Sequence, residues 1–171
     1  SLSFVSRAGG KIRRKPVPAF DAILELMKTR GHILGAEALH LHWDRVHGPD
    51  AARMDQRVVG RIKQSEKMSA VDLVEIQQQR QRLIAGTDDL IGEAMLLFPT
   101  TPHVAMPIAP LEASMEEFFR ANAKTLRNST AGNFLDWCGL SLPNGTGAAG
   151  MPTGLLLSAR HGRDDELLAA G

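Results

Sequence analysis

Arg80 is the charged residue with the most unusual sequence surroundings. At 3.6 residues per turn, one side of a helix would carry Arg80 together with Leu73, Ile76, Leu83 and Ile84. A guanidinium among apolar side chains needs an acceptor, which is either a structural carboxylate or carbonyl of the protein or the carboxylate of a ligand. Its planar fork fits a carboxylate through two parallel hydrogen bonds. The sequence leaves both roles open.

A second candidate for chemistry is a set of possible metal ligands, His40, Asp44 and His47, which share one face of a predicted helix. His42 and Trp43 interrupt the set, and a His40–Asp44 pair on a solvated face explains the spacing without a cation. We therefore expect no metal site.

Residues 145–150 match the dinucleotide-binding pattern G-x-G-x-x-G letter for letter. That pattern requires a helix on its far side, whose N-terminus holds the pyrophosphate. Here residues 151–154 lead into another apolar run. We expect a flexible hairpin and no cofactor.

The N-terminal region is basic, with no acidic residue before Asp21. Its cationic side chains are Arg7, Lys11, Arg13, Arg14 and Lys15. Because no aromatic residue is interleaved with them, the pattern indicates a solvated strand, predicted over Ile12–Val17, more than a nucleic-acid platform.

The elements that would position these residues are mostly helices. Apolar spacing predicts helices over residues 20–30 and 33–46 and a short one around 58–62. Capping boxes at Ser69–Asp72 and Ser114–Glu117 predict two further helices, the first reaching about residue 94. Three acids at 164–166 begin a last helix.

Three apolar runs without alternation predict buried strands covered on both faces, at Met95–Phe98, Leu140–Leu142 and Leu155–Leu157. The last two are joined by a turn. The fold class is therefore α/β and helix-rich. Such a sheet would leave unpaired edges, which predicts self-association, so a homo-oligomer is a possible state.

Composition limits the classes of protein further. The 171 residues are 43% hydrophobic and 23% charged, as in globular proteins, and predict one compact domain without a separate second one. The net charge of +1 argues against nucleic-acid and membrane partners. A single cysteine, Cys138, and the lack of a signal or membrane segment favour a cytoplasmic location.

Five short segments carry a family resemblance in their order, spacing and letters. They are residues 98–102 (FPTTP), 126–133 (LRNSTAGN), 140–145 (LSLPNG), 150–156 (GMPTGLL) and 162–168 (GRDDELL). Together they resemble the C-terminal portion of the amidase signature family, which includes amidases and the glutamyl-tRNA amidotransferase A subunit. With the upstream Arg80 region, the resemblance covers nearly the whole chain.

The resemblance implies a serine amide hydrolase built on a mixed β-sheet covered by helices, whose catalytic site uses a lysine and two serines. No residue of that triad can be placed in this chain. We therefore expect the C-terminal portion of a single amidase domain, truncated at both ends and inactive alone, whose partners are the remainder of that domain and a small-molecule amide.

The same resemblance implies that Arg80, Thr100, Thr101 and Pro102 line the substrate pocket, with Arg80 holding a carboxylate. The amide itself, and the choice between a free-standing amidase and an amidotransferase subunit, stay open. The alternative is a noncatalytic binding or scaffolding protein that uses the basic segment Lys11–Lys15.

Overall fold

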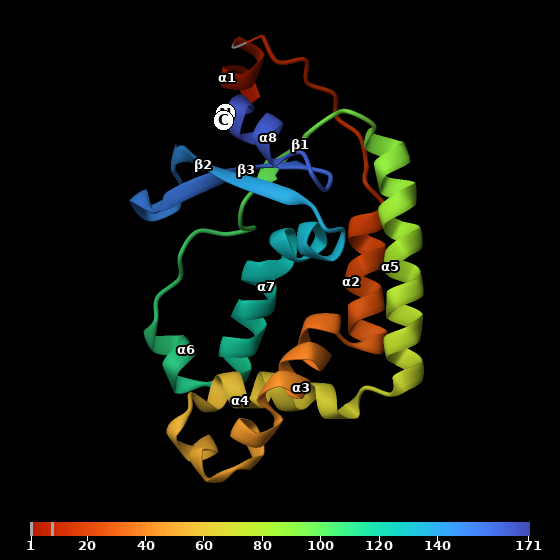
Figure 1. Cartoon of the computed structure of the whole chain (residues 1–171). Coiled ribbons are helices and arrows are strands. Elements are labelled where there is room, and N and C mark those ends of the chain that lie inside the picture. Colours follow the sequence, from red (N-terminus) through yellow and green to blue (C-terminus); the bar gives the residue numbers. More distant parts are fainter. Residues whose placement is uncertain (1, 8) are drawn as a thin grey trace. The chain divides into compact units, whose positions relative to one another are not determined.

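The computed structural model describes residues 2–7 and 9–171 of the chain, which form two compact units (Figure 1). Unit 1 comprises residues 1–20 and 87–171, and unit 2 comprises residues 21–86. The divisions fall within α2 (Ala19–Arg30) and α5 (Ala70–Ile91), two helices that the sequence predicts.

Unit 2 is helical. Between α2 and α5 it contains α3 (Ile33–His47), the 3₁₀ helix η1 (Pro49–Arg53), α4 (Gln56–Lys63) and the 3₁₀ helix η2 (Gln64–Lys67). The predicted helices are confirmed. Gly31 ends α2 with φ +95°, a backbone conformation that glycine adopts without strain, and donates its N–H to the Met27 carbonyl at 3.0 Å.

Side-chain hydrogen bonds cap the N-termini of two helices in this unit, α4 and α5. The Asp55 side chain caps α4 by accepting the Arg57 N–H at 2.9 Å. At the start of α5, Ser69 Oγ accepts the Asp72 N–H at 3.0 Å and Asp72 Oδ2 accepts the Ser69 N–H at 3.1 Å. The predicted Ser69–Asp72 capping box is therefore formed on both sides.

Unit 1 contains a three-stranded antiparallel sheet in the order β1 (Leu96–Pro99), β3 (Pro152–Ala159), β2 (Cys138–Thr146). The register places Leu97 and Leu140 opposite Leu157, on the two sides of the central strand. All three predicted strands are confirmed. In β2, however, half-buried Leu140 and Leu142 alternate with exposed Gly139 and Ser141, so full coverage of both faces does not extend to that strand.

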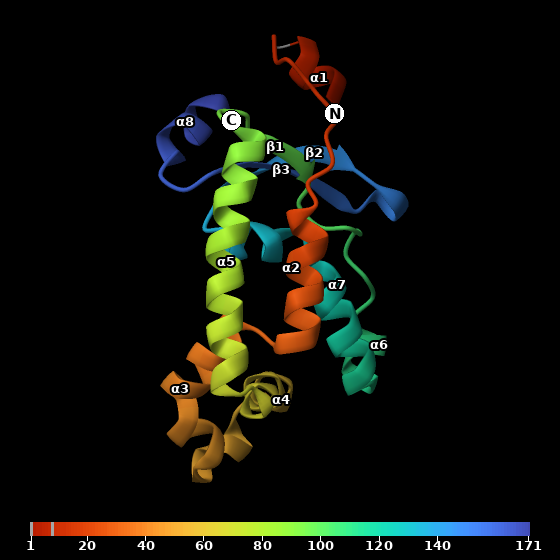
Figure 2. The ribbon, with the colours of Figure 1, turned by 90° about the vertical axis from the view of Figure 1, so that its right-hand side faces the viewer.

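Helices of unit 1 lie on opposite faces of its sheet, as Figures 1 and 2 show for α8 (Asp164–Ala170) and α7 (Met115–Phe134). Buried Leu167 anchors α8, which contacts β2 and β3. On the α7 side, Gly132 lies beside Ser158. The unit also contains α1 (Leu2–Arg7), α6 (Ala109–Ala113) and the 3₁₀ turn η3 (Ala148–Gly150).

The predicted strand at Ile12–Val17 is wrong. Residues 11–17 form no helix and no strand, because Pro16 and Pro18 have no N–H to donate to a ladder. Lys15 instead donates from Nζ to the carbonyl of Leu90, near the end of α5, at 2.9 Å.

The glycine-rich segment 145–150 joins β2 to β3, as the predicted hairpin requires, and the strand β3 follows it in place of a helix. Its backbone uses positive φ at Gly145 (+100°) and Gly150 (+72°). None of the helices in the described parts of the chain is both long and apolar enough to cross a membrane.

Candidate functional site

The candidate site in unit 1 is built where Thr100 follows β1. Its N–H donates to the Gly154 carbonyl at 2.9 Å, which extends the pairing of β1 with β3 by one residue. Its hydroxyl lies 2.6 Å from the hydroxyl of Ser141 in β2. The two outer strands of the sheet are therefore linked across the central strand by a hydrogen bond between side chains.

Gly154 makes that link possible. A Cβ atom at this position would lie 2.7 Å from Thr100 Oγ1 and 2.8 Å from Ser141 Oγ, well inside van der Waals contact. The hydroxyl pair thus crosses directly over the backbone of β3 where a side chain is absent.

Thr101 and His103 shape the loop that follows. The exposed Thr101 donates its hydroxyl to the His103 carbonyl at 2.8 Å, and half-buried Pro102 lies between them. The imidazole of His103 contacts the Val104 carbonyl through Nδ1 (2.7 Å) and the Thr125 hydroxyl through Nε2 (3.0 Å). Because a carbonyl only accepts, Nδ1 carries a proton here. His103 thereby ties the loop to α7.

Asn128 of α7 completes the loop's attachment by donating from Nδ2 to the Pro99 carbonyl at 2.8 Å. We refer to Thr100, Asn128, Ser141 and Gly154 together as the hydroxyl site. Each comes from a different segment among the five that carry the family resemblance. Residues up to 54 positions apart are brought together by strand register and helix packing.

Arg80 is half-buried on α5, as its apolar neighbours predict, and belongs to unit 2, whereas Thr100, Thr101 and Pro102 belong to unit 1. Their joint contribution to one pocket stays a prediction.

Nucleophile activation needs a base next to the hydroxyl. Among the residues that the structure describes, no serine hydroxyl is hydrogen-bonded to a histidine or a lysine. Ser141 pairs with Thr100, Ser158 donates to the Cys138 carbonyl, and Ser129 donates to the Leu126 carbonyl. The hydroxyl site is therefore suited to binding: its hydroxyls can donate hydrogen bonds to a polar ligand and accept hydrogen bonds from it.

Two histidines have carboxylate partners that sequence reasoning missed. His161 Nδ1 lies 3.2 Å from Asp136 Oδ2, at the exposed end of the sheet. His47 contacts Glu66 at 2.9 Å through Nε2 and the Trp43 carbonyl at 2.9 Å through Nδ1, so it binds neither His40 nor Asp44. Such pairs lack a sequence signal because their partners are 19 and 25 residues away.

Within the described ranges, no group of three or more histidine, cysteine or carboxylate side chains is arranged to hold a metal ion. The free thiol of Cys138, which is half-buried, lies 3.5 Å from the Ala159 carbonyl.

Comparison with known proteins identifies a curated protein of similar sequence. A 2-amino-5-chloromuconic acid deaminase from Comamonas testosteroni is 30% identical over 154 residues, which cover 90% of this chain and 33% of the relative. The chain thus spans about a third of the length of that curated relative. No protein-family model matches the sequence.

Solved structures show the same fold. A serine-to-alanine variant of allophanate hydrolase from Kluyveromyces lactis aligns with a TM-score of 0.81 at 22% identity, over 99% of this chain and 27% of that one. A 6-aminohexanoate cyclic dimer hydrolase in complex with substrate aligns with a TM-score of 0.74 at 17% identity, over 98% and 38%. The predicted α/β fold class is confirmed.

Proposed function

We propose that this chain, whose homologues are amidase signature enzymes, forms the C-terminal part of a serine amidohydrolase that cleaves the C–N bond of a small carboxylic-acid amide. The homologues confirm the resemblance that the five segments predict. The observation that carries the proposed function is the hydroxyl site, where residues of four of those segments meet in one hydrogen-bonded arrangement.

In this proposal the chain supplies one wall of the substrate pocket, including Thr100, Thr101 and Pro102. Hydroxyl and amide groups suit the recognition of an amide, which both donates and accepts hydrogen bonds. The lysine and the two serines of the catalytic site come from the remainder of the domain, because Ser141 is paired with a second hydroxyl and has no base beside it.

The first test compares the purified 171-residue chain with a longer polypeptide that contains it, on a panel of simple amides. We expect turnover by the longer form and none by the chain, because an activated nucleophile and an oxyanion site supply most of the barrier reduction. Turnover by the chain that is lost on mutating one of its own serines would refute the proposal.

Arg80 is proposed to hold the carboxylate of the substrate, a role supported by its place in the resemblance and by the acid named for the Comamonas relative. In the longer polypeptide, Arg80→Gln should raise KM roughly tenfold or more for an amide that carries a carboxylate. KM for a neutral amide should change little.

The matched control is Arg82→Gln, since Arg82 is exposed on the same helix. Equal losses with charged and neutral amides in Arg80→Gln, together with a lower unfolding midpoint, would assign Arg80 a structural role.

A further inference from the structure

The imidazole of His47, at the end of α3, faces two hydrogen-bond acceptors. Its Nε2 lies 2.9 Å from Glu66 Oε1 in η2, and its Nδ1 lies 2.9 Å from the Trp43 carbonyl, one turn earlier in the same helix. A carbonyl and a carboxylate only accept hydrogen bonds, whereas a neutral imidazole carries a proton on one of its two nitrogens. Both contacts are therefore hydrogen bonds only when the ring carries two protons and a positive charge.

Three features of the surroundings favour the charged ring. Glu66 supplies a negative charge in direct contact with Nε2. The ring also lies at the C-terminal end of a 15-residue helix, where the macrodipole favours a cation. The indole of Trp43 stacks on the ring, with centroids 4.1 Å apart and an angle of 31° between the two planes. The face of an indole attracts a cation at this distance.

Other charged groups belong to the elements that pack on α3, which are η1, α4 and η2. Asp50 and Arg53 of η1 lie 3.3 Å apart, and Asp55, which precedes α4, binds Arg57. The other ionisable groups in the last two turns of α3 and in α4 and η2 are His40, His42, Asp44, Arg45, Arg61, Lys63 and Lys67. The cations among them oppose a second proton on His47. The direction of the pH dependence is nevertheless set by the geometry, because only the doubly protonated ring satisfies both acceptors.

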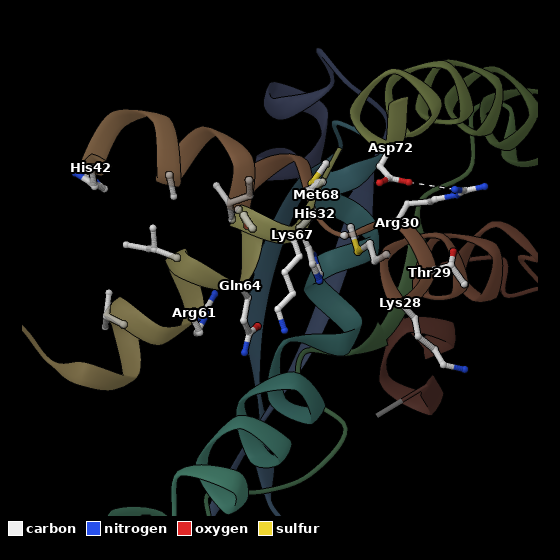
Figure 3. Close-up of a pocket in the computed structure, with 18 residues that line it drawn as sticks. Lys28, Thr29, Arg30, His32, His42, Arg61, Gln64, Lys67, Met68 and Asp72 are labelled. Carbon is white, nitrogen blue, oxygen red and sulfur yellow. Dashed lines mark hydrogen bonds and ion pairs between the residues drawn. The ribbon is translucent and has the colours of Figure 1, made fainter. Parts of the chain in front are cut away.

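The helix η2, to which Glu66 belongs, is a wall shared by two cavities of unit 2. Gln64, Ser65 and Lys67 line a cavity of about 690 Å³, in which Figure 3 labels the first and the last of the three. Ser65 also lines a second cavity of about 250 Å³, together with Trp43. Every residue of η2 is exposed or half-buried, so few apolar contacts hold this wall in place.

We propose that His47 and Glu66 form a proton-dependent clasp, which holds η2 against the end of α3 and releases it as pH rises. When the ring loses one proton, a nitrogen lone pair faces either the carboxylate or the carbonyl, so one of the two contacts becomes repulsive. Histidine is the side chain whose charge ordinarily changes between about pH 5 and 8, so the clasp acts near neutral pH. Its release changes the shape of both cavities. This inference does not depend on the proposed amidohydrolase activity.

The first test is the ¹⁵N NMR spectrum of the His47 ring in the purified chain, assigned by its absence from His47→Gln. We expect protons on both ring nitrogens at about pH 5.5 and on one nitrogen at about pH 8.5. The amide signals of residues 64–67 should shift together with the ring, because η2 is released. In Glu66→Gln, these amide signals should lose most of their pH dependence. His161→Gln, which removes the ring of another histidine–carboxylate pair, in unit 1, should leave them unchanged.

Urea unfolding of His47→Gln, Glu66→Gln and the double variant gives a second readout. At about pH 5.5 each single variant should raise the equilibrium constant of unfolding about fivefold, and the double variant should add little, because both changes remove the same contact. At about pH 8.5 we expect effects of less than about twofold, since the clasp is already open. A ring with one proton at the lower pH, amide shifts of residues 64–67 that persist in Glu66→Gln, or equal effects at both pH values would overturn the proposal.

Discussion

Gly154 is the residue on which the hydroxyl site depends most directly. In Gly154→Ala the new methyl group meets two hydroxyls at 2.7 and 2.8 Å. We expect the free energy of unfolding to fall by about 1–3 kcal/mol, as for other overpacked positions. Urea unfolding measures this change. Addition of Thr100→Ala, which removes the nearer hydroxyl, should recover part of the loss.

Gly86→Ala is the matched control, because nothing lies within 4 Å of a Cβ at this position in α5. Alanine is favoured over glycine inside a helix, so the control should gain roughly 0.5–1 kcal/mol. Similar effects of the two substitutions would contradict the steric role of Gly154.

The lowered pKa of a single residue, Asp72, predicts that the free energy of unfolding depends on pH. Hydrogen bonds from Ser69 and Arg30 lower its pKa in the folded state, so the unfolded chain binds the proton more tightly. The stabilisation is complete above the unfolded value of about 3.9 and is lost as pH falls through the lower folded value.

The difference in urea midpoint between the natural chain and Asp72→Asn should therefore be largest near neutral pH. It should fall toward zero under acid conditions. Asp89→Asn, an exposed change on the same helix, should show no such convergence. A gap that persists under strongly acid conditions would rule out an electrostatic origin.

At the scale of elements, Ser114 defines the start of α7. Its hydroxyl accepts the Glu117 N–H at 3.2 Å, whereas the Glu117 carboxylate bonds Arg120, so the predicted capping box is formed on one side. Ser114→Ala should lower the free energy of unfolding by about 1 kcal/mol.

Ser129→Ala serves as its control in the same helix. Ser129 donates only to the Leu126 carbonyl one turn earlier, and removal of that bond should cost less than about 0.5 kcal/mol. Thermal unfolding of the two variants, compared side by side, measures the difference. A larger loss at Ser129 would mean that α7 is not positioned by its N-cap.

At the scale of the whole molecule, the rival function is that of a noncatalytic binding or scaffolding protein that uses the basic segment Lys11–Lys15 on an anionic partner, and nucleic acid serves as the probe. This segment is exposed and carries no aromatic residue, and Lys15 is bonded to Leu90. We expect a dissociation constant weaker than about 10 μM for single-stranded DNA at about 150 mM salt. Fluorescence anisotropy measures it, and tight binding that weakens steeply with salt would favour the rival function.

The sequence by itself determined the local elements. Helices α2, α3, α5 and α7 follow from apolar spacing and caps, which act over one or two turns, and the apolar runs mark the positions of β1, β2 and β3. The strand expected at Ile12–Val17 failed because a strand exists only with a hydrogen-bonded partner, which residues far away in the chain must supply.

Only the tertiary structure decided which distant side chains meet. The register of β3 between its neighbours brings Thr100 to Ser141 over Gly154, and the fold of unit 2 brings His47 to Glu66. These contacts depend on strand register and helix packing, which are set by the sum of many weak long-range contacts and leave no periodic signal in any short segment.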